Sequence, residues 1–240
     1  MARIFITGSA DGLGQLAGKK LVEEGHQVVL HARNNQRAEY ALLKVPGAEQ
    51  VLTADLSIPE ETRILAEKVN ALGTFDAIIH NAGVCHTQEQ IILAVNTLAP
   101  YVLTCLIHKP RRTIYLSSRM HMNGNPDPGI MDTGTISYSD SKLYILLLSK
   151  AVARKWPDVL SNAVNPGWVP TKMGGKDAPD DLQKGYETQV WLAAGTDAKF
   201  SGRYFFHQKE APCHEAADLT ELQDQFIERC EQITGVHFPD

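Results

Sequence analysis

The sequence predicts an α/β protein with a doubly wound parallel sheet of about seven strands and helices on both faces. Short, continuously apolar runs alternate with longer helical patterns along the whole chain. Such runs are typical of parallel strands that are covered on both faces. Pro and Gly gather in Asn123–Gly134 and Pro166–Pro179, each after an expected strand. In open α/β sheets, ligand loops lie at these positions.

The apolar runs and the periodic segments between them define the expected elements. Strands are expected at Arg3–Thr7, Gln27–Ala32, Gln50–Ala54, Ala77–His80, Thr113–Ser117, Leu160–Asn165 and Arg203–Phe206. Helices are expected at Gly12–Gly25, Gln36–Leu43, Pro59–Leu72, Glu89–Ile107, Ile136–Trp156, Asp181–Ala194 and Asp218–Thr234. Strand–helix alternation at this spacing favours one sheet with right-handed crossovers.

Composition indicates one soluble globular domain over residues 1–240. Hydrophobic residues make up 43% and charged residues 21% of the chain, and the net charge is -5. This charge argues against nucleic acid or an anionic membrane as the main partner. The four scattered cysteines are expected to be free thiols, and no apolar run of about 18 residues suggests a membrane span. No metal-ligand spacing is recognised. Together these features predict a cytoplasmic protein without a metal.

The first predicted strand runs into a glycine-rich loop, Thr7–Gly14, with the spacing G-x-x-x-G-x-G. Glycines here permit a tight turn and let backbone N–H groups approach a pyrophosphate at a helix N-terminus. The simpler alternative is a strand-to-helix loop that needs glycines only for its turns. The position at the first strand–helix junction favours cofactor binding.

Further motifs occur in a fixed order along the chain. They are Asn81-Ala82-Gly83, Asn96, Ser118, Tyr138-x-x-x-Lys142, Pro166-Gly167 and Ser201–Phe205. With the glycine loop, they resemble the short-chain dehydrogenase/reductase (SDR) family over essentially the whole chain. The S-S-x-x-H pattern of Ser117–His121 and the long loop after it resemble retinol-dehydrogenase-like members. The resemblance implies a Rossmann-type, NAD(P)-binding domain.

The resemblance also implies roles for individual residues. Tyr138 would transfer the proton, Ser118 would hold the substrate oxygen, and Lys142 would bond the nicotinamide ribose. Asn96 would support a water-linked proton path from Lys142. The implied cofactor contacts are Gly8, Ser9, Asp11, Gly12, Leu13, Gly14, Arg33, Asp55, Leu56, Asn81, Ala82, Gly83, Tyr138, Lys142, Pro166, Gly167, Val169 and Thr171.

Some of these assignments have alternatives. Ser117 could be chosen instead of Ser118, and either hydroxyl could simply satisfy backbone at a strand end. Asp55 would accept a hydrogen bond from the adenine amino group, or it could cap a turn. His121 could touch the substrate, although a polar loop histidine is the favoured interpretation.

Tyr138 and Lys142 are four residues apart and would share one face of a helix. A tyrosine hydroxyl has a pKa near 10 and is a poor base at neutral pH. An ammonium about 4 Å away, at an effective dielectric near 20, favours the phenolate by about 4 kcal/mol. We therefore expect Lys142 to lower the pKa of Tyr138 by about three, into the range of general acid–base catalysis.

The end of the second predicted strand favours NADP(H) over NAD(H). Ala32 lies where NAD-using relatives carry an acidic residue, and Arg33 follows at once. His31 and Arg37 lie nearby. An Arg fork suits a phosphate dianion. Asp11 argues against a preference for NADP(H), because many NADP-using relatives have a basic residue at this place in the glycine loop.

The leading hypothesis is an NADP(H)-dependent oxidoreductase that interconverts a small-molecule carbonyl and an alcohol. The alternatives are a dinucleotide-binding regulator without turnover and a sugar-nucleotide epimerase or dehydratase. A regulator typically loses the Tyr or Lys, and an epimerase carries a larger C-terminal domain. A homodimer or homotetramer is expected through the Tyr-bearing helix, where Leu143, Tyr144, Leu146 and Leu147 are apolar.

Overall fold

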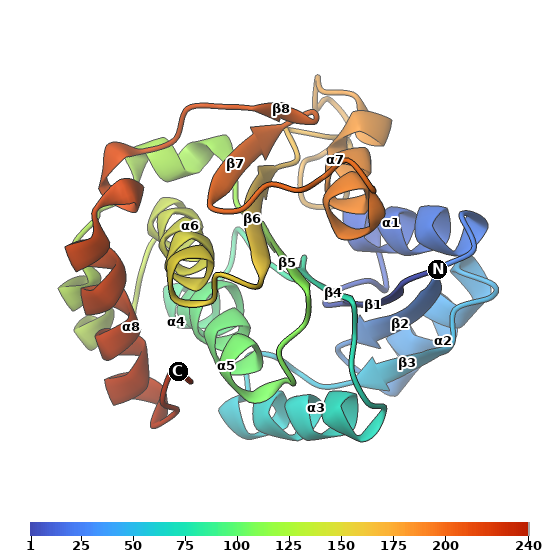
Figure 1. Cartoon of the computed structure of the whole chain (residues 1–240), viewed down its shortest axis with the longest axis horizontal. Helices are drawn as coiled ribbons and strands as arrows, with labels where there is room; N and C mark the ends of the chain where they lie inside the picture. The colour runs from blue at the N-terminus through green and yellow to red at the C-terminus, as the bar shows by residue number, and fades with distance from the viewer. Residues whose placement is uncertain (240) are drawn as a thin grey trace.

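The computed structural model describes residues 1–239 and contains one eight-stranded sheet in the order β3-β2-β1-β4-β5-β6-β7-β8 (Figure 1). The first seven strands are parallel, and β8 pairs antiparallel with β7. The strands are β1 Arg3–Ile6, β2 Gln27–Ala32, β3 Gln50–Thr53, β4 Ala77–His80, β5 Arg112–Leu116, β6 Leu160–Asn165, β7 Arg203–Phe206 and β8 Lys209–Glu210. The predicted fold class is confirmed. The sequence prediction of about seven strands did not include β8, which consists of only two polar residues.

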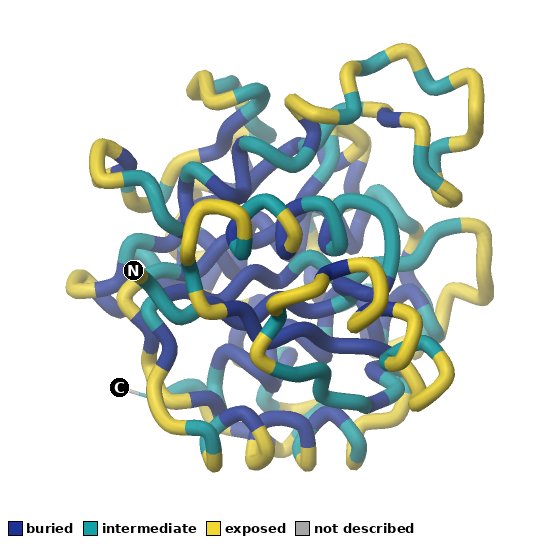
Figure 2. The backbone as a smooth tube through the Cα atoms, turned by 90° about the vertical axis from the view of Figure 1, so that its right-hand side faces the viewer, coloured by how far each residue is buried: buried dark blue, intermediate teal, exposed yellow. Residues whose placement is uncertain are grey.

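Helices cover both faces of the sheet. They are α1 Gly12–Glu23, α2 Asn35–Lys44, α3 Pro59–Ala71, α4 Glu89–Ile92, α5 Ala99–Leu106, α6 Tyr138–Lys155, α7 Leu182–Ala194 and α8 Thr220–Thr234. Alternate residues of one strand face opposite sides: Ile4 packs with α1 and α7, whereas Phe5 packs with α3 and α5. Most residues of the central strands are therefore buried, and Figure 2 shows buried backbone in dark blue inside a shell of exposed loops.

A capping box fixes the start of α6, and with it the position of Tyr138. The Ser137 hydroxyl accepts a hydrogen bond from the Asp140 N–H (3.2 Å), and the Asp140 carboxylate accepts one from the Ser137 N–H (2.9 Å). Such a box satisfies backbone donors that a helix start leaves unpaired. Tyr138 is therefore the first residue of a well-defined helix.

Asn96 lies in a π-helical segment, Leu93–Leu98, between α4 and α5. Pro100 follows at the start of α5 and has no N–H to donate to the carbonyl of Asn96, four residues earlier. A wider turn accommodates this missing bond, and such turns are frequent at functional sites. The continuous helical stretch Glu89–Leu106 has the length and composition of a membrane span, but most of it is buried inside the protein. The sequence prediction had recognised no such stretch.

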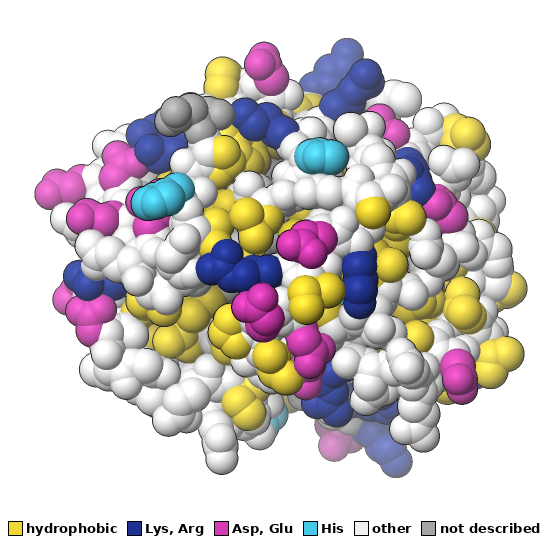
Figure 3. All heavy atoms as spheres, turned by 90° about the horizontal axis from the view of Figure 1, so that it is seen from below, with side chains coloured by type: hydrophobic (Ala, Val, Ile, Leu, Met, Phe, Trp, Pro, Cys, Tyr) yellow, Lys and Arg dark blue, Asp and Glu magenta, His cyan; other side chains and the backbone are white. Residues whose placement is uncertain are grey.

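The loop between Ser118 and Tyr138 forms two 3-10 helices, Arg119–Asn123 and Pro128–Thr133, and the second packs against α8. In turn, α8 packs along α6, with the rings of Phe226 and Tyr144 5.6 Å apart. The apolar side chains on which the dimer expectation rested, Leu143, Tyr144, Leu146 and Leu147, are fully buried within the chain. On the face shown in Figure 3, acidic and basic side chains are intermixed.

Candidate active site

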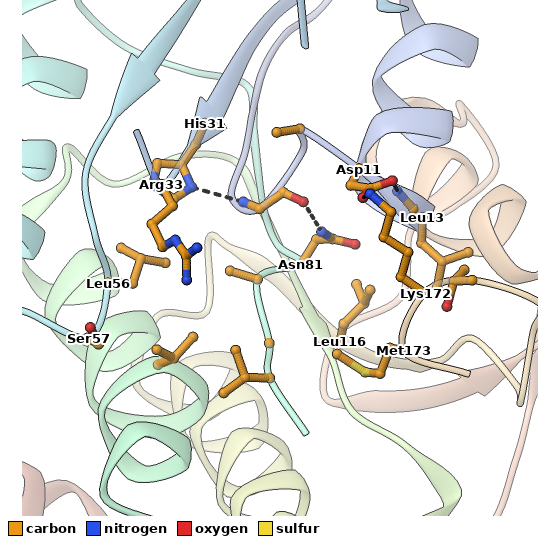
Figure 4. Close-up of a pocket in the computed structure, with 18 of the residues that line it drawn as sticks. Asp11, Leu13, His31, Arg33, Leu56, Ser57, Asn81, Leu116, Lys172 and Met173 are labelled. Carbon is orange, nitrogen blue, oxygen red and sulfur yellow. Dashed lines mark hydrogen bonds and ion pairs between the residues drawn. The ribbon is translucent and has the colours of Figure 1, made fainter. Parts of the chain in front are cut away.

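A cavity of about 830 Å³ lies at the carboxyl ends of the parallel strands, where the strand order reverses between β1 and β4 (Figure 4). In doubly wound sheets this edge is the usual position of a ligand site. Fourteen of the residues that the sequence predicted for the functional site line this cavity. They are Gly8, Asp11, Gly12, Leu13, Arg33, Asp55, Leu56, Asn81, Ala82, Gly83, Tyr138, Lys142, Pro166 and Thr171. The cavity therefore extends from the end of β2 to the start of α6.

The glycine loop leaves β1 with Gly8 at φ +62°, a left-handed conformation that favours glycine. A Cβ on Gly8 would also lie 2.7 Å from the Cα of Ala82. The Asn81 amide donates to the carbonyls of Thr7 (3.0 Å) and Gly8 (3.1 Å). The loop is thus held close against the residues that follow β4.

Four predicted cofactor residues do not line the cavity. The Ser9 hydroxyl is buried and donates to the Ile6 carbonyl (2.8 Å). A Cβ on Gly14 would lie 2.4 Å from the Asn81 amide, and one on Gly167 would lie 2.7 Å from Asp180. Val169 is buried against Gly185. These residues shape the loops by packing and lie outside the cavity lining, and their assignment as cofactor contacts stays a prediction.

Ser118, Tyr138 and Lys142 meet at one end of the cavity. The Ser118 hydroxyl is near enough to the Tyr138 hydroxyl to lower its pKa, whereas the Ser117 hydroxyl donates to the Lys142 carbonyl (2.7 Å). This geometry favours Ser118 over its neighbour as the hydroxyl beside Tyr138, although Ser117 and not Ser118 contributes to the cavity lining. The Lys142 ammonium donates to the Leu116 carbonyl (2.9 Å) and lies 5.3 Å from the centre of the Tyr138 ring.

The expected lowering of the Tyr138 pKa by Lys142 is wrong for this structure. Burial raises the pKa of Tyr138 to about 12, and the neighbouring Ser118 hydroxyl lowers it only in part. Burial also lowers the pKa of Lys142 to about 8. The charge argument expected desolvation to oppose only part of the shift, whereas desolvation is the largest effect on the pKa of both groups. It also assumed an ammonium free to approach the hydroxyl, whereas the Lys142 ammonium is held by the Leu116 carbonyl (2.9 Å), 5.3 Å from the centre of the Tyr138 ring.

Asn96 is buried and does not line the cavity. Its side chain exchanges two hydrogen bonds with the backbone of Val84 (2.8 and 2.9 Å) and donates to the Ser141 hydroxyl (3.1 Å). A Cβ on Gly83 would lie 3.3 Å from the Lys142 ammonium and 3.6 Å from the Asn96 carbonyl oxygen. Glycine at position 83 thus gives Lys142 and Asn96 room on either side.

The other end of the cavity is formed by the residues after β2 and β3. Arg33 is exposed at this end, next to the buried Ala32. The Asp55 carboxylate accepts hydrogen bonds from the backbone N–H (3.0 Å) and hydroxyl (2.7 Å) of Ser57. Asp55 therefore caps a turn while it lines the cavity, so the two sequence interpretations are compatible.

Asp11 joins three segments around the cavity. Its carboxylate caps α1 by accepting from the Gly12 N–H (2.8 Å), and it forms ion pairs with Arg37 (3.3 Å) and Lys172. These bonds lower the pKa of Asp11 although partial burial opposes them. Lys172 follows Thr171, whose hydroxyl accepts from the Gly174 N–H (3.2 Å). The loop after β6 is thereby attached to the glycine loop.

Two histidines near the site are structural. The buried His121 hydrogen bonds to the Ser118 carbonyl through Nδ1 (2.6 Å) and accepts from the His214 N–H at Nε2 (3.0 Å). His121 thus lies in the loop, as the favoured interpretation expects, and is buried there. His31 is also buried, and burial lowers its pKa to about 4, so it adds no positive charge beside Arg33.

Sequence reasoning missed several lining residues. They are Ala10, Ala54, Ser57, Val84, Thr87, Ile91, Val95, Leu116, Lys172 and Met173. Most directly adjoin a predicted site residue, so proximity to a strand end was the available signal. Ile91 and Val95 lie on the helical stretch after β4, and no motif marks them.

Comparison with known proteins identifies the family. The short chain dehydrogenase family model matches residues 2–105. An uncharacterized oxidoreductase of Emericella nidulans is 44% identical over 100% of this chain and 99% of its own length. The chain belongs to the short-chain dehydrogenase family. A short-chain dehydrogenase of Penicillium rubens, chyC, is 41% identical over the full length of both proteins.

Solved structures share the fold of this chain. An uncharacterized protein from Mycobacterium paratuberculosis aligns over 100% of this chain and 96% of its own, with a TM-score of 0.85 and 21% identity. A blue fluorescent protein from a metagenomic library, in complex with NADPH, aligns over 85% of this chain and 95% of its own (TM-score 0.73, 18% identity). Residues 1–239 contain no group of three or more His, Cys, Asp or Glu side chains that could hold a metal ion.

Proposed function

We propose that this SDR protein is an NADP(H)-dependent oxidoreductase that interconverts a carbonyl and an alcohol. The observation that carries the proposal is the contact of the Ser118 and Tyr138 hydroxyls, with Lys142 beside them, at one end of the cavity. Paired hydroxyls can hold and protonate a carbonyl oxygen. Beside them the cavity extends to the glycine loop, as a dinucleotide site requires.

The cavity residues fit a nicotinamide dinucleotide. A volume of about 830 Å³ lies within the usual range for ligand sites. The glycine loop opens α1, whose N-terminal N–H groups suit a pyrophosphate. Arg33, Arg37 and Lys172 line the cavity and supply positive charge for the phosphate groups of the dinucleotide. When bound, the dinucleotide supplies the hydride.

The protein residues supply the proton and the positioning. In carbonyl reduction, the Ser118 hydroxyl would donate a hydrogen bond to the substrate oxygen and Tyr138 would donate its proton to it. With a pKa of about 12, Tyr138 is protonated at neutral pH and is ready to act as the acid. The Lys142 ammonium is held by the Leu116 carbonyl and would bond the nicotinamide ribose.

The preference for NADP(H) is part of the proposal and is supported by the end of β2. The uncharged Ala32 lies where NAD-using relatives carry an acidic residue. Arg33, which follows it, is exposed at that end of the cavity. Arg37 also lines the cavity, where Asp11 holds it. A cytoplasmic location is proposed too, which the four free thiols support.

Oxidation of NADPH at 340 nm, screened over aldehydes, ketones and quinones, tests the proposal. We expect turnover with at least one carbonyl class. Tyr138→Phe should bind dinucleotide nearly as wild type, but its kcat should fall by about 10²-fold or more because the proton donor is lost. A dinucleotide-binding regulator would bind NADPH and show no turnover. A Tyr138→Phe variant that kept more than about a tenth of wild-type kcat would contradict the catalytic assignment.

A further inference from the structure

We propose that His31 is a positioning residue that holds the Gly8 peptide of the glycine loop and thereby sets the affinity for the dinucleotide. The proposal rests on the proposed function, because it assumes a dinucleotide on this loop. His31 lies near the end of β2, is only 3% exposed and contributes to the lining of the cavity. Figure 4 shows its ring pointing to the backbone of the loop.

The hydrogen bonds of His31 define its tautomer. The Gly8 N–H can only donate, so Nδ1 of His31, 2.9 Å away, must accept and carry no proton. The proton of the neutral ring is therefore on Nε2, which donates to the Ala54 carbonyl at 3.0 Å. Burial lowers the pKa of His31 to about 4, so this neutral form prevails at neutral pH.

The Gly8 peptide is held from both sides. His31 accepts from its N–H, and the Asn81 amide donates to the Thr7 carbonyl of the same peptide group (3.0 Å) and to the Gly8 carbonyl (3.1 Å). The backbone N–H of His31 also donates to the Ser9 hydroxyl (2.8 Å), and the Ser9 N–H donates to the His31 carbonyl (3.0 Å). The first turn of the loop is thus attached to β2 through backbone and side chain together.

One side chain therefore connects three segments that border the cavity: the glycine loop, the end of β2 and the end of β3 at Ala54. A loop that binds phosphate through its backbone N–H groups depends on their exact placement before the ligand arrives. Loss of the His31 contact would leave the Gly8 N–H without its acceptor and let the loop move. The cost would appear in cofactor affinity, while the proton-transferring end at Tyr138 would be unchanged.

Two conservative variants separate the contacts of His31. In His31→Asn, the amide oxygen lies at the level of Nδ1 and can still accept from Gly8. In His31→Gln, the amide nitrogen lies at the level of Nε2 and can still donate to Ala54. The dissociation constant of NADPH is measured by its fluorescence without substrate, and cofactor KM and kcat are measured at saturating carbonyl substrate. Phe226→Leu, a core variant in α8, is the control for lowered stability.

We expect His31→Asn to bind NADPH within about threefold of wild type. His31→Gln and His31→Ala should bind about tenfold more weakly, as the loss of one buried hydrogen bond implies. Cofactor KM should rise in parallel, with kcat within about twofold. Phe226→Leu should lower the unfolding temperature without changing the dissociation constant. Equal affinities in the Asn and Gln variants would overturn the role of His31. Failure of the wild-type protein to bind NADPH or NADH would overturn the proposed function itself.

Discussion

At the scale of single residues, burial of the Lys142 ammonium lowers the stability of the fold. The residue is only 6% exposed, and burial lowers its pKa from 10.5 to about 8. This difference corresponds to about 3 kcal/mol of unfavourable desolvation in the charged form. The hydrogen bond to Leu116 offsets part of it. Burial of the charged Lys142 side chain thus lowers the stability of the folded protein at neutral pH.

The pH dependence of stability tests this cost. Because the pKa of Lys142 is lower in the folded than in the unfolded protein, the unfolded state binds more protons between pH 8 and 10.5. The contribution of Lys142 to stability should therefore rise with pH through that window. Relative to Lys142→Met, wild type should gain about 3 kcal/mol between pH 7 and pH 11, measured by urea denaturation. The exposed Lys176→Met is the control, and a constant difference between wild type and Lys142→Met would contradict the prediction.

Cofactor choice is a second prediction at this scale, and it depends on Arg33. A charge-assisted hydrogen bond of about 1.5–3 kcal/mol to a 2′-phosphate would give about 10- to 150-fold preference. We expect kcat/KM to be at least about tenfold higher with NADP(H) than with NAD(H), and Arg33→Ala to lose most of that ratio. Arg229→Ala, on α8, should keep it. Equal efficiency of wild type with both cofactors would refute the preference.

At the scale of elements, the loop after β6 is attached to the glycine loop by the Lys172–Asp11 ion pair. Lys172 is exposed, so the pair is worth at most about 1 kcal/mol. Lys172→Ala should speed amide hydrogen exchange in residues 171–175 and speed NADPH release by about two- to fivefold. Lys176→Ala, in the same segment, should leave both rates near wild type. Unchanged exchange in Lys172→Ala would show that the pair does not restrain the loop.

The elements themselves were largely predictable from the sequence. Every predicted strand lies within one residue of the observed one, because β-branched apolar runs between helical segments leave little choice. The π-helical turn at Asn96 was missed, since it depends on how Pro100 disrupts the preceding helix. The pKa of Tyr138 was missed for a related reason. Spacing places Lys142 on the same helix face, but only tertiary packing determines burial and the position of the ammonium.

At the scale of the whole molecule, the C-terminal part of the chain covers helix α6. The C-terminal segment packs α8 on α6, and the Tyr101 hydroxyl donates to the Val236 carbonyl (2.8 Å). The rings of Trp156 and Phe238 lie 5.0 Å apart. The apolar residues of α6 that predicted a dimer or tetramer are therefore already in contact with protein.

We therefore predict a monomer of 26.4 kDa, in place of the oligomer expected from the sequence. Sedimentation equilibrium at micromolar concentration should show a single species of that mass. The packing of α8 should contribute strongly to stability: Phe226 is fully buried, and Phe226→Ala should cost about 3–5 kcal/mol in urea denaturation. Leu219→Ala, at an exposed position just before α8, should cost much less. A stable wild-type dimer would mean that another face of the molecule forms the interface, because the apolar residues of α6 are enclosed by the chain's own C-terminal segment.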